Sequence, residues 1–141
     1  MASRHLTLRV SEDLHHRLEA QSRRERESVS EIARRLIEEG LRMEAHPGIV
    51  FRAGPMGRRA GLARGPDVWE VISVFPEWDD GWDIRSREEL GATSVSAHDV
   101  WVSLRYYRSY PKEIDELIRL NDEAAEEGYQ EWLEQQPVAS R

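Results

Sequence analysis

The chain lacks cysteine, and it lacks any long hydrophobic run. None of its 141 residues is a cysteine, which excludes a disulfide framework and a thiolate metal site. No stretch approaches the roughly 18 uninterrupted apolar residues of a membrane span, and the N-terminus has no apolar signal-peptide core. Charged residues make up 33% of the chain, and the mean hydropathy is −0.70. We therefore expect a cytoplasmic protein that is not bound to a membrane.

Patterns of metal ligands and catalytic groups are also missing. His15 and His16 are adjacent, so on a helix they point about 100° apart and cannot chelate one metal together. Ser96, His98 and Asp99 contain the residue types of a catalytic triad. Because they lie within one helix start, they cannot align as nucleophile, base and orienting group. We expect no enzyme activity, no cofactor and no metal site.

The net charge of −7 is unevenly divided along the chain. Residues 1–64 hold 13 arginines against 9 acidic residues, a balance of +4. Residues 65–141 hold 7 basic and 18 acidic residues, a balance of −11. A basic segment can neutralise phosphate, which suits the N-terminal half to DNA. The acidic half would be repelled by phosphate, so it either meets a protein partner or is a solvated face.

The most informative pattern is an alternation of polar and apolar residues at the N-terminus. Residues 5–10 read H-L-T-L-R-V, and a helix start follows at Ser11. One short strand with two amphipathic helices has too small a core to fold alone. We expect two copies to pair these strands antiparallel across a two-fold axis. The polar face of that ribbon would be free to enter a DNA major groove.

Two helices should follow this strand. Ser11 is the expected N-cap of a helix over residues 12–25, and Ser28 with Glu31 forms a capping box for the next helix. The second helix carries a core stripe at i, i+3, i+4, i+7 and i+8, formed by Val29, Ile32, Ala33, Leu36 and Ile37. It should end near Gly40, ahead of a linker at residues 44–47.

This ordered combination resembles the ribbon–helix–helix family of bacterial DNA-binding proteins over about a third of the chain. The resemblance rests on the inward residues of the strand, on Thr7 and Arg9, on Ser11, and on the S-V-S-E helix start at residues 28–31. It implies a DNA-binding set of Arg4, His5, Thr7, Arg9, Ser28 and Ser30, with a phosphate held at the start of the second helix. It also implies a dimer core of Leu6, Leu8, Val10, Leu14, Leu18, Ile32 and Leu36. An edge strand of another α+β domain is the alternative interpretation.

The remaining residues predict a helical domain with one hairpin. Residues 49–52 and 58–63 flank a turn at residues 54–57. A short helix should begin at Pro66 and Asp67, with Val68, Val71, Ile72 and Phe75 on one side, and should end at Pro76. Residues 77–83 read as a loop. Ser86 and Glu89 form a second capping box, which begins a very short helix that is closed by Gly91.

Two longer helices complete this domain. Ser96 with Asp99 predicts a capped helix, and its expected inner stripe is Val100, Trp101, Leu104 and Tyr107. Together with the short helix before Gly91 it outlines a helix–turn–helix pair. A last helix should begin with Pro111, dock through Ile114, Leu117 and Ile118, and stop at Pro137.

Residues 48 to about 121 are similar to a small helical domain of uncharacterised function that occurs in antitoxins encoded beside PIN-like nucleases. The similarity rests on R-R-A-G-L-A at residues 58–63, P-D-V-W-E-V at 66–71 and L-R-Y-Y-R-S-Y-P-K-E-I-D at 104–115. With the acidic charge and the large aromatic residues, it implies a toxin-binding surface that includes Tyr106, Tyr110, Ile114, Tyr129 and Trp132. The alternative is that Tyr129 and Trp132 fold back onto the protein's own hairpin.

The sequence therefore predicts a mainly α protein with two domains, residues 1–45 and 48–141. Its expected function is that of an antitoxin in a type II toxin–antitoxin module, with operator DNA, a PIN-like ribonuclease toxin and a second copy of itself as partners. A stand-alone ribbon–helix–helix repressor with a C-terminal ligand-binding or oligomerisation domain is the main alternative. A partition accessory protein that binds repeated sites is the third interpretation.

Overall fold

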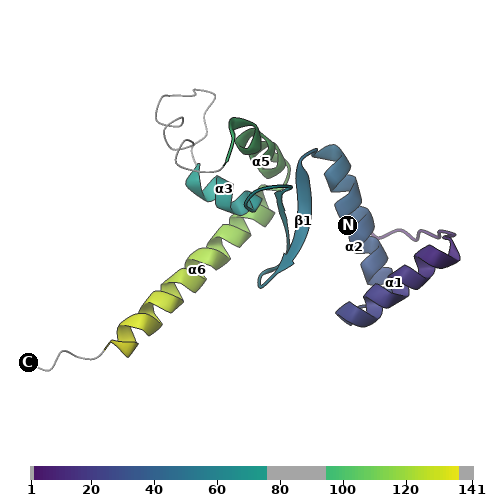
Figure 1. Cartoon of the computed structure of the whole chain (residues 1–141), viewed down its shortest axis with the longest axis horizontal. Coiled ribbons are helices and arrows are strands. Elements are labelled where there is room, and N and C mark those ends of the chain that lie inside the picture. Colours follow the sequence, from purple (N-terminus) through teal and green to yellow (C-terminus); the bar gives the residue numbers. More distant parts are fainter. Residues whose placement is uncertain (1, 76–94, 137–141) are drawn as a thin grey trace, which may run out of the picture. The chain divides into compact units, whose positions relative to one another are not determined.

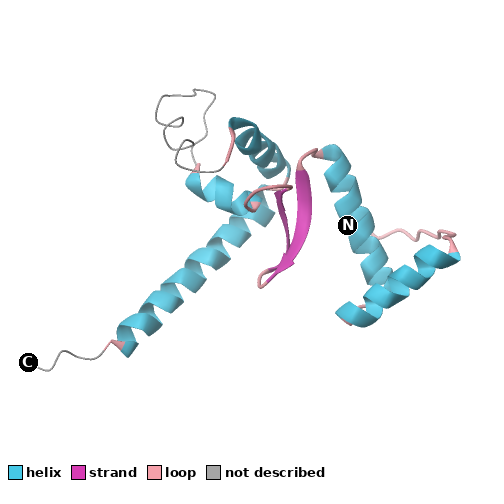
Figure 2. Ribbon diagram, in the orientation of Figure 1, coloured by secondary structure: helices cyan, strands magenta, loops and turns pink. Residues whose placement is uncertain are grey.

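The computed structural model describes residues 2–75 and 95–136. Within these residues the chain is mainly helical, with five helices and one two-stranded antiparallel hairpin (Figure 1, Figure 2). It divides into two compact units, residues 1–42 and residues 43–141. No helix in the described ranges is long and apolar enough to cross a membrane. The expected loop at 77–83, the Ser86/Glu89 capping box, the short helix before Gly91 and the stop at Pro137 lie outside the described residues.

The first unit contains helix α1 (Glu12–Glu25) and most of helix α2 (Val29–Ala45). Both predicted caps are confirmed: Ser11 Oγ accepts the Leu14 N–H at 3.2 Å, and Ser28 and Glu31 exchange hydrogen bonds of 3.1 and 3.2 Å. The predicted end of the second helix near Gly40 is wrong, because α2 continues to Ala45. A glycine inside a helix costs about 1 kcal/mol relative to alanine, which the flanking turns can absorb.

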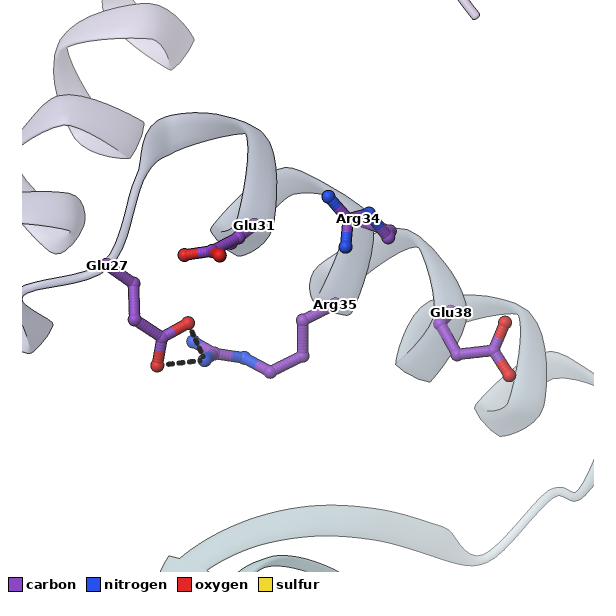
Figure 3. A pocket seen from close by; sticks show the side chains of 5 residues that line it. All are labelled: Glu27, Glu31, Arg34, Arg35 and Glu38. Carbon is purple, nitrogen blue, oxygen red and sulfur yellow. Dashed lines mark hydrogen bonds and ion pairs between the residues drawn. The ribbon is translucent and has the colours of Figure 1, made fainter. Parts of the chain in front are cut away.

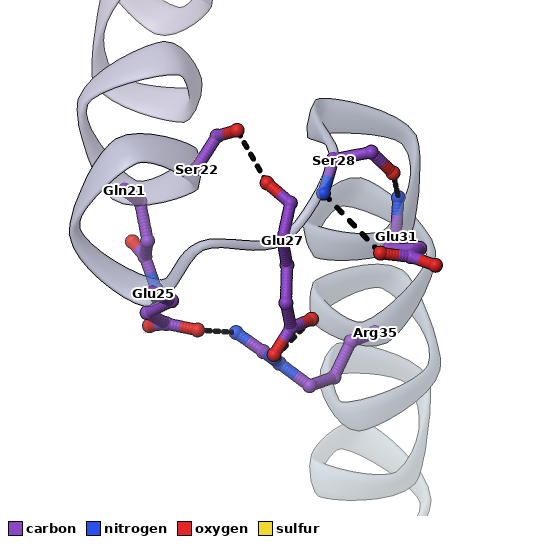
Figure 4. Close-up of polar contacts among 7 residues, drawn as sticks. All are labelled: Gln21, Ser22, Glu25, Glu27, Ser28, Glu31 and Arg35. Carbon is purple, nitrogen blue, oxygen red and sulfur yellow. Dashed lines mark hydrogen bonds and ion pairs between the residues drawn. The ribbon is translucent and has the colours of Figure 1, made fainter.

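A tight connection joins α1 to α2 (Figure 4). Arg26 takes a left-handed backbone conformation with φ 56°, and its N–H and that of Glu27 both bond to the Ser22 carbonyl. The Glu27 bond is the 6→1 bond of a Schellman motif, and the Arg26 bond is the 5→1 bond of an αL cap. Arg35 of α2 then reaches back to Glu25 at 2.5 Å and to Glu27 at 3.0 Å. The hydrogen bond that Arg35 donates to the Glu25 carboxylate is the main reason that the pKa of Arg35 is raised.

Residues 2–11, ahead of α1, are not in a strand. The expected strand over residues 5–10 would take its hydrogen bonds from a second copy, and one chain supplies no such partner. Leu6 and Leu8 are accordingly 70% and 59% exposed. Whether this segment forms a ribbon stays a prediction.

The second unit begins with the predicted hairpin, which is confirmed. Strand β1 (Ile49–Gly54) pairs with β2 (Gly57–Leu62), from Ile49 opposite Leu62 to Gly54 opposite Gly57. Pro55 and Met56 form the turn between them, and Gly57 accepts the positive φ of 89° that follows.

Helices α3 (Val68–Val74) and α5 (Ala97–Ser109) pack against this hairpin, and α6 (Pro111–Gln135) packs against both helices. Helix α5 contacts both strands, α3 and α6. The core that they share is formed by Ile49, Ala60, Leu62, Val68, Val71, Ile72, Phe75, Val100, Val102, Tyr106, Ile114 and Leu117. The predicted apolar side of α3 and the predicted docking residues Ile114 and Leu117 are therefore confirmed.

The predicted inner stripe of α5 is partly wrong. Val100 is buried as expected, but Trp101 is 53% exposed, and Ser103 and Tyr106 are fully buried instead. Because α5 packs against both the hairpin and α3, its buried face is broader than one stripe and includes Val102. The small side chain of Ser103 lets the neighbouring elements approach closely.

An ion cluster that sequence reasoning missed ties the hairpin to α3. Asp67 is a buried residue in the capping box that opens α3, and its carboxylate pairs with Arg59 and, at 3.3 Å, with Arg52. The guanidinium groups of these two arginines occupy the space that a Cβ would need at Gly54 and Gly61. Glycine at both positions therefore allows the arginines to lie across the hairpin and reach the carboxylate.

Candidate functional site

The predicted DNA-contacting residues of the N-terminal segment all lie on an exposed stretch. Arg4, His5, Thr7 and Arg9 are exposed, and so are the apolar residues that alternate with them. The cap at Ser11 fixes where this stretch ends and where α1 begins. In a single copy, the predicted DNA-contacting residues and the apolar residues between them are therefore both exposed to solvent.

The predicted dimer core is mostly uncovered too. Only Ile32 is fully buried, Leu18 is half-buried, and α1 has no buried residue. Exposed fractions of 40% or more remain at Leu6, Leu8, Val10, Leu14, Leu36, Ile37 and Leu41. Nothing among the described residues covers these apolar side chains, and exposed apolar surface of this kind is typical of interaction sites.

The start of α2, where the resemblance implies a phosphate contact, is already partly occupied. Ser28 and Ser30 are exposed, but the Ser28 N–H donates to Glu31 at 3.2 Å. A phosphate at this helix end would have to displace the Glu31 carboxylate or bind beside it.

An open cavity of about 560 Å³ lies along the same face of α2 (Figure 3). Its lining is formed by Glu27, Glu31, Arg34, Arg35 and Glu38. Glu27 is bonded to Arg35, and Arg34 has no ion pair within the described part of the chain. Three carboxylates among five side chains make this groove a poor phosphate site, so we assign the Arg35 contacts to holding α1 and α2 together.

The second candidate surface is the far half of α6. Every residue from 122 to 136 is exposed, and Figure 1 shows this part of the helix leading away from α3 and α5. Tyr129 and Trp132 are 54% and 53% exposed, with their rings stacked at 6.1 Å, and Leu133 lies one residue further. The alternative in which these rings fold back onto the hairpin is therefore wrong. No basic residue occurs between Arg119 and the end of α6, so every charged residue on this surface is acidic.

Two residues expected on the toxin-binding surface are core residues. Tyr106 and Ile114 have no exposed surface, and Tyr110 is half-buried with its ring 4.8 Å from that of Tyr106. Neither Tyr106 nor Ile114 can meet a partner without unfolding of the unit. The spacing of Tyr106 from Val100 and Ser103, i, i+3 and i+6, could have placed it on the inner face of its helix.

Sequence reasoning also missed an exposed face of α5. His98, Trp101, Arg105 and Arg108 are exposed at i, i+3, i+7 and i+10 of this helix. The Trp101 ring stacks with His98 at 5.9 Å, and the Arg105 guanidinium lies 5.5 Å from its centre. A cavity of about 290 Å³ adjoins this face, lined by His46, Pro47, Gly48, His98, Trp101, Val102 and Arg105. The helical spacing of the four residues was the available signal.

The described residues contain no cluster of three or more histidine or acidic side chains that could hold a metal ion. Comparison with protein-family models, curated proteins and solved structures finds no match to this chain. A functional assignment therefore depends on the chemistry of the two uncovered surfaces and on the sequence resemblances.

Proposed function

We propose that this protein is the antitoxin of a type II toxin–antitoxin module. Its first unit dimerises and binds the operator of its own operon, and its second unit binds and neutralises a PIN-like ribonuclease. The observation that carries the proposal is the uncovered apolar surface of residues 6–41, because a soluble unit of this size gains most of its core by pairing with a second copy.

Pairing would contribute substantial stability. Burying one leucine side chain fully is worth about 1.5–3 kcal/mol, and the exposed set contains leucines on the N-terminal segment and on both helices. The ribbon formed by two copies of residues 5–10 would place Thr7 and Arg9 on its outer face. Arginine can make two hydrogen bonds to guanine in the major groove, which gives sequence discrimination.

The toxin-binding half of the proposal rests on the far half of α6. The outer half of this helix is exposed among the described residues of its unit, so it is available to a partner. The stacked Tyr129 and Trp132 are the large anchors that interface cores favour. The surrounding carboxylates fit a groove with a basic rim, and a nuclease that binds RNA offers such a rim. The PIN-like identity of this nuclease comes from the resemblance of residues 48–121.

The deciding experiment expresses the full chain with the product of the neighbouring gene and measures co-purification and nuclease activity. Truncation after Asn121 should abolish neutralisation while the dimer and operator binding remain. Within the full chain, Trp132→Ala should weaken toxin binding by about 30-fold, as expected for an interface anchor worth 2 kcal/mol. Trp101→Ala is the matched control, because Trp101 is equally exposed at 53% but lies on α5.

Full neutralisation by the truncated chain would remove the far half of α6 from the mechanism. If the neighbouring gene product neither binds nor is inhibited while operator binding persists, the protein is a stand-alone repressor instead.

A further inference from the structure

Helix α5 presents a basic and aromatic face within the acidic half of the chain. Its exposed residues are Ala97, His98, Trp101, Arg105, Arg108 and Ser109. None of these is acidic, although residues 65–141 carry a balance of −11. We call His98, Trp101, Arg105 and Arg108 the α5 stripe. Such a segregation of charge indicates that this face meets a ligand of negative charge.

Within the described residues, the two arginines of the α5 stripe have no acidic partner. Arg105 and Arg108 form no ion pair within residues 2–75 and 95–136, whereas Arg52, Arg59 and Arg35 are all held by carboxylates. Arg105 instead lies over the Trp101 ring. A guanidinium with free donors can take two oxygens of a phosphate at once.

The cleft beside Trp101 adds an apolar component. Its volume of about 290 Å³ suits one flat ring system rather than a folded peptide, and Pro47, Gly48 and Val102 give it an apolar wall. Trp101 is 53% exposed. Its neighbours His98 and Arg105 are exposed side chains that can change rotamer to admit a ring against the indole.

We propose that the α5 stripe binds single-stranded nucleic acid, with one base in the cleft against Trp101 and the flanking phosphates on Arg105 and Arg108. Stacking of unpaired bases on aromatic side chains and pairing of phosphates with cations are the two contacts by which proteins hold single strands. A duplex keeps its bases stacked inside, so it could not use the cleft. This site shares no residue with the N-terminal segment 2–11 or with the far half of α6.

The acidic residues of α6 do not cancel this site. Its long acidic run begins at Asp122, and Figure 1 shows that part of α6 leading away from α5. Charges separated by more than about 8 Å are largely screened at physiological salt. Closer to α5, Glu113 and Asp115 accept hydrogen bonds from Tyr106 and Tyr107.

The test is fluorescence anisotropy of fluorescein-labelled ten-nucleotide oligo(U) and oligo(dT), titrated with the full-length protein. We expect binding that weakens with salt. The logarithm of the association constant should fall with the logarithm of the salt concentration with a slope of about −1.4, the value for two phosphates on a single strand. Trp101→Ala should weaken binding about tenfold or more, and Trp101→Phe should restore most of it. Arg105→Gln should weaken binding and flatten the salt slope.

Matched controls separate this site from the other surfaces. Trp132→Ala removes an equally exposed tryptophan from α6, and Arg64→Gln removes an exposed arginine outside the stripe; both should bind the single strands as the wild type does. Arg9→Ala should lower operator binding but not single-strand binding, so failure here and failure of the proposed operator contact are distinguishable. Circular dichroism of each variant checks that the fold is retained.

Three results would overturn the proposal. The first is equal affinity of Trp101→Ala and wild type for both oligonucleotides. The second is a higher affinity for a ten-base-pair duplex without operator sequence than for either single strand, if Arg105→Gln lowers that duplex affinity. The third is binding of uridine monophosphate alone, with no binding of the strands.

Discussion

The hydroxyl of Tyr106 donates a hydrogen bond to Glu113 Oε2 at 2.7 Å, from a ring that is fully buried. Its neighbour Tyr107 makes the same kind of bond to Asp115, also at 2.7 Å. Both bonds run from the last turn of α5 to the first two turns of α6, across the corner at Tyr110 and Pro111. The corner is therefore held by two side-chain bonds and by the fixed φ of proline, and it sets the direction in which α6 leaves the unit.

The first prediction compares these two tyrosines. Tyr106→Phe should lower the free energy of unfolding of the second unit by about 1 kcal/mol, because it removes the hydrogen bond that the buried Tyr106 donates to Glu113. Tyr107→Phe should cost about 0.5 kcal/mol or less, because Tyr107 and Asp115 are open to water. Denaturant titration followed by far-ultraviolet circular dichroism measures both. An equal loss of unfolding free energy in the two variants would contradict a larger contribution from the buried Tyr106 hydrogen bond.

The second prediction concerns alkaline pH. The hydrogen bond to Asp115 raises the pKa of Tyr107 above its usual value of 10. The neutral phenol is thus favoured in the folded state, so its contribution is fully present below pH 10 and is lost as the pH rises through the folded-state pKa. The melting temperature of the wild type should fall toward that of Tyr107→Phe above pH 10. A difference between them that stays constant from pH 8 to pH 11.5 would argue against this coupling.

Local signals in the sequence were sufficient for the helix starts. The caps at Ser11, Ser28 and Ser96 and the proline at position 111 all act within one turn, and the structure confirms each of them. The hairpin was equally local, since its turn residues and strand residues are adjacent in the chain. Such features depend on backbone groups within four residues of the signal.

Features that depend on distant residues were not predicted. The convergence of Arg52 and Arg59 on Asp67 requires the hairpin to pack on α3, which no short pattern encodes. The size of an aromatic side chain does not tell a core residue from an interface residue, so the sequence alone favours a surface role for Tyr106 that its burial contradicts. Residues 5–10 differ in kind: their proposed strand partner belongs to another copy, so one chain cannot display it.

The third prediction uses the strained position between α1 and α2. Arg26 has a φ of 56°, a conformation that costs an L-residue about 1 kcal/mol or more and costs glycine almost nothing. Arg26→Gly should therefore raise the melting temperature of the protein at fixed concentration. Arg24→Gly, two residues earlier and inside α1, is the control and should lower it, by about 1 kcal/mol in stability. A melting temperature that falls for both variants would show that the Arg26 side chain matters more than its backbone.

The fourth prediction tests the dimer. Leu8→Asp or Leu36→Asp would place a charge in the shared core of two copies, and each should dissociate the dimer and unfold the first unit. Leu133→Asp, at a comparable exposure of 43% on α6, should leave the dimer intact. Sedimentation velocity and circular dichroism report the two properties separately. A well-folded wild-type monomer at micromolar concentration would refute the dimer.

The last prediction concerns the operator. Arg9→Ala should weaken operator binding and relax sequence preference, because one arginine–guanine pair is worth about 1–3 kcal/mol of discrimination. Arg4→Ala should weaken binding evenly across sequences and reduce the salt dependence, because a phosphate contact carries no sequence information. Both residues are exposed on the same segment, so neither change should disturb the fold. Titration of operator and scrambled duplexes at two salt concentrations separates the two effects. If a fragment lacking residues 1–45 bound the operator as tightly as the whole chain, the residues that bind the operator would lie in the second unit.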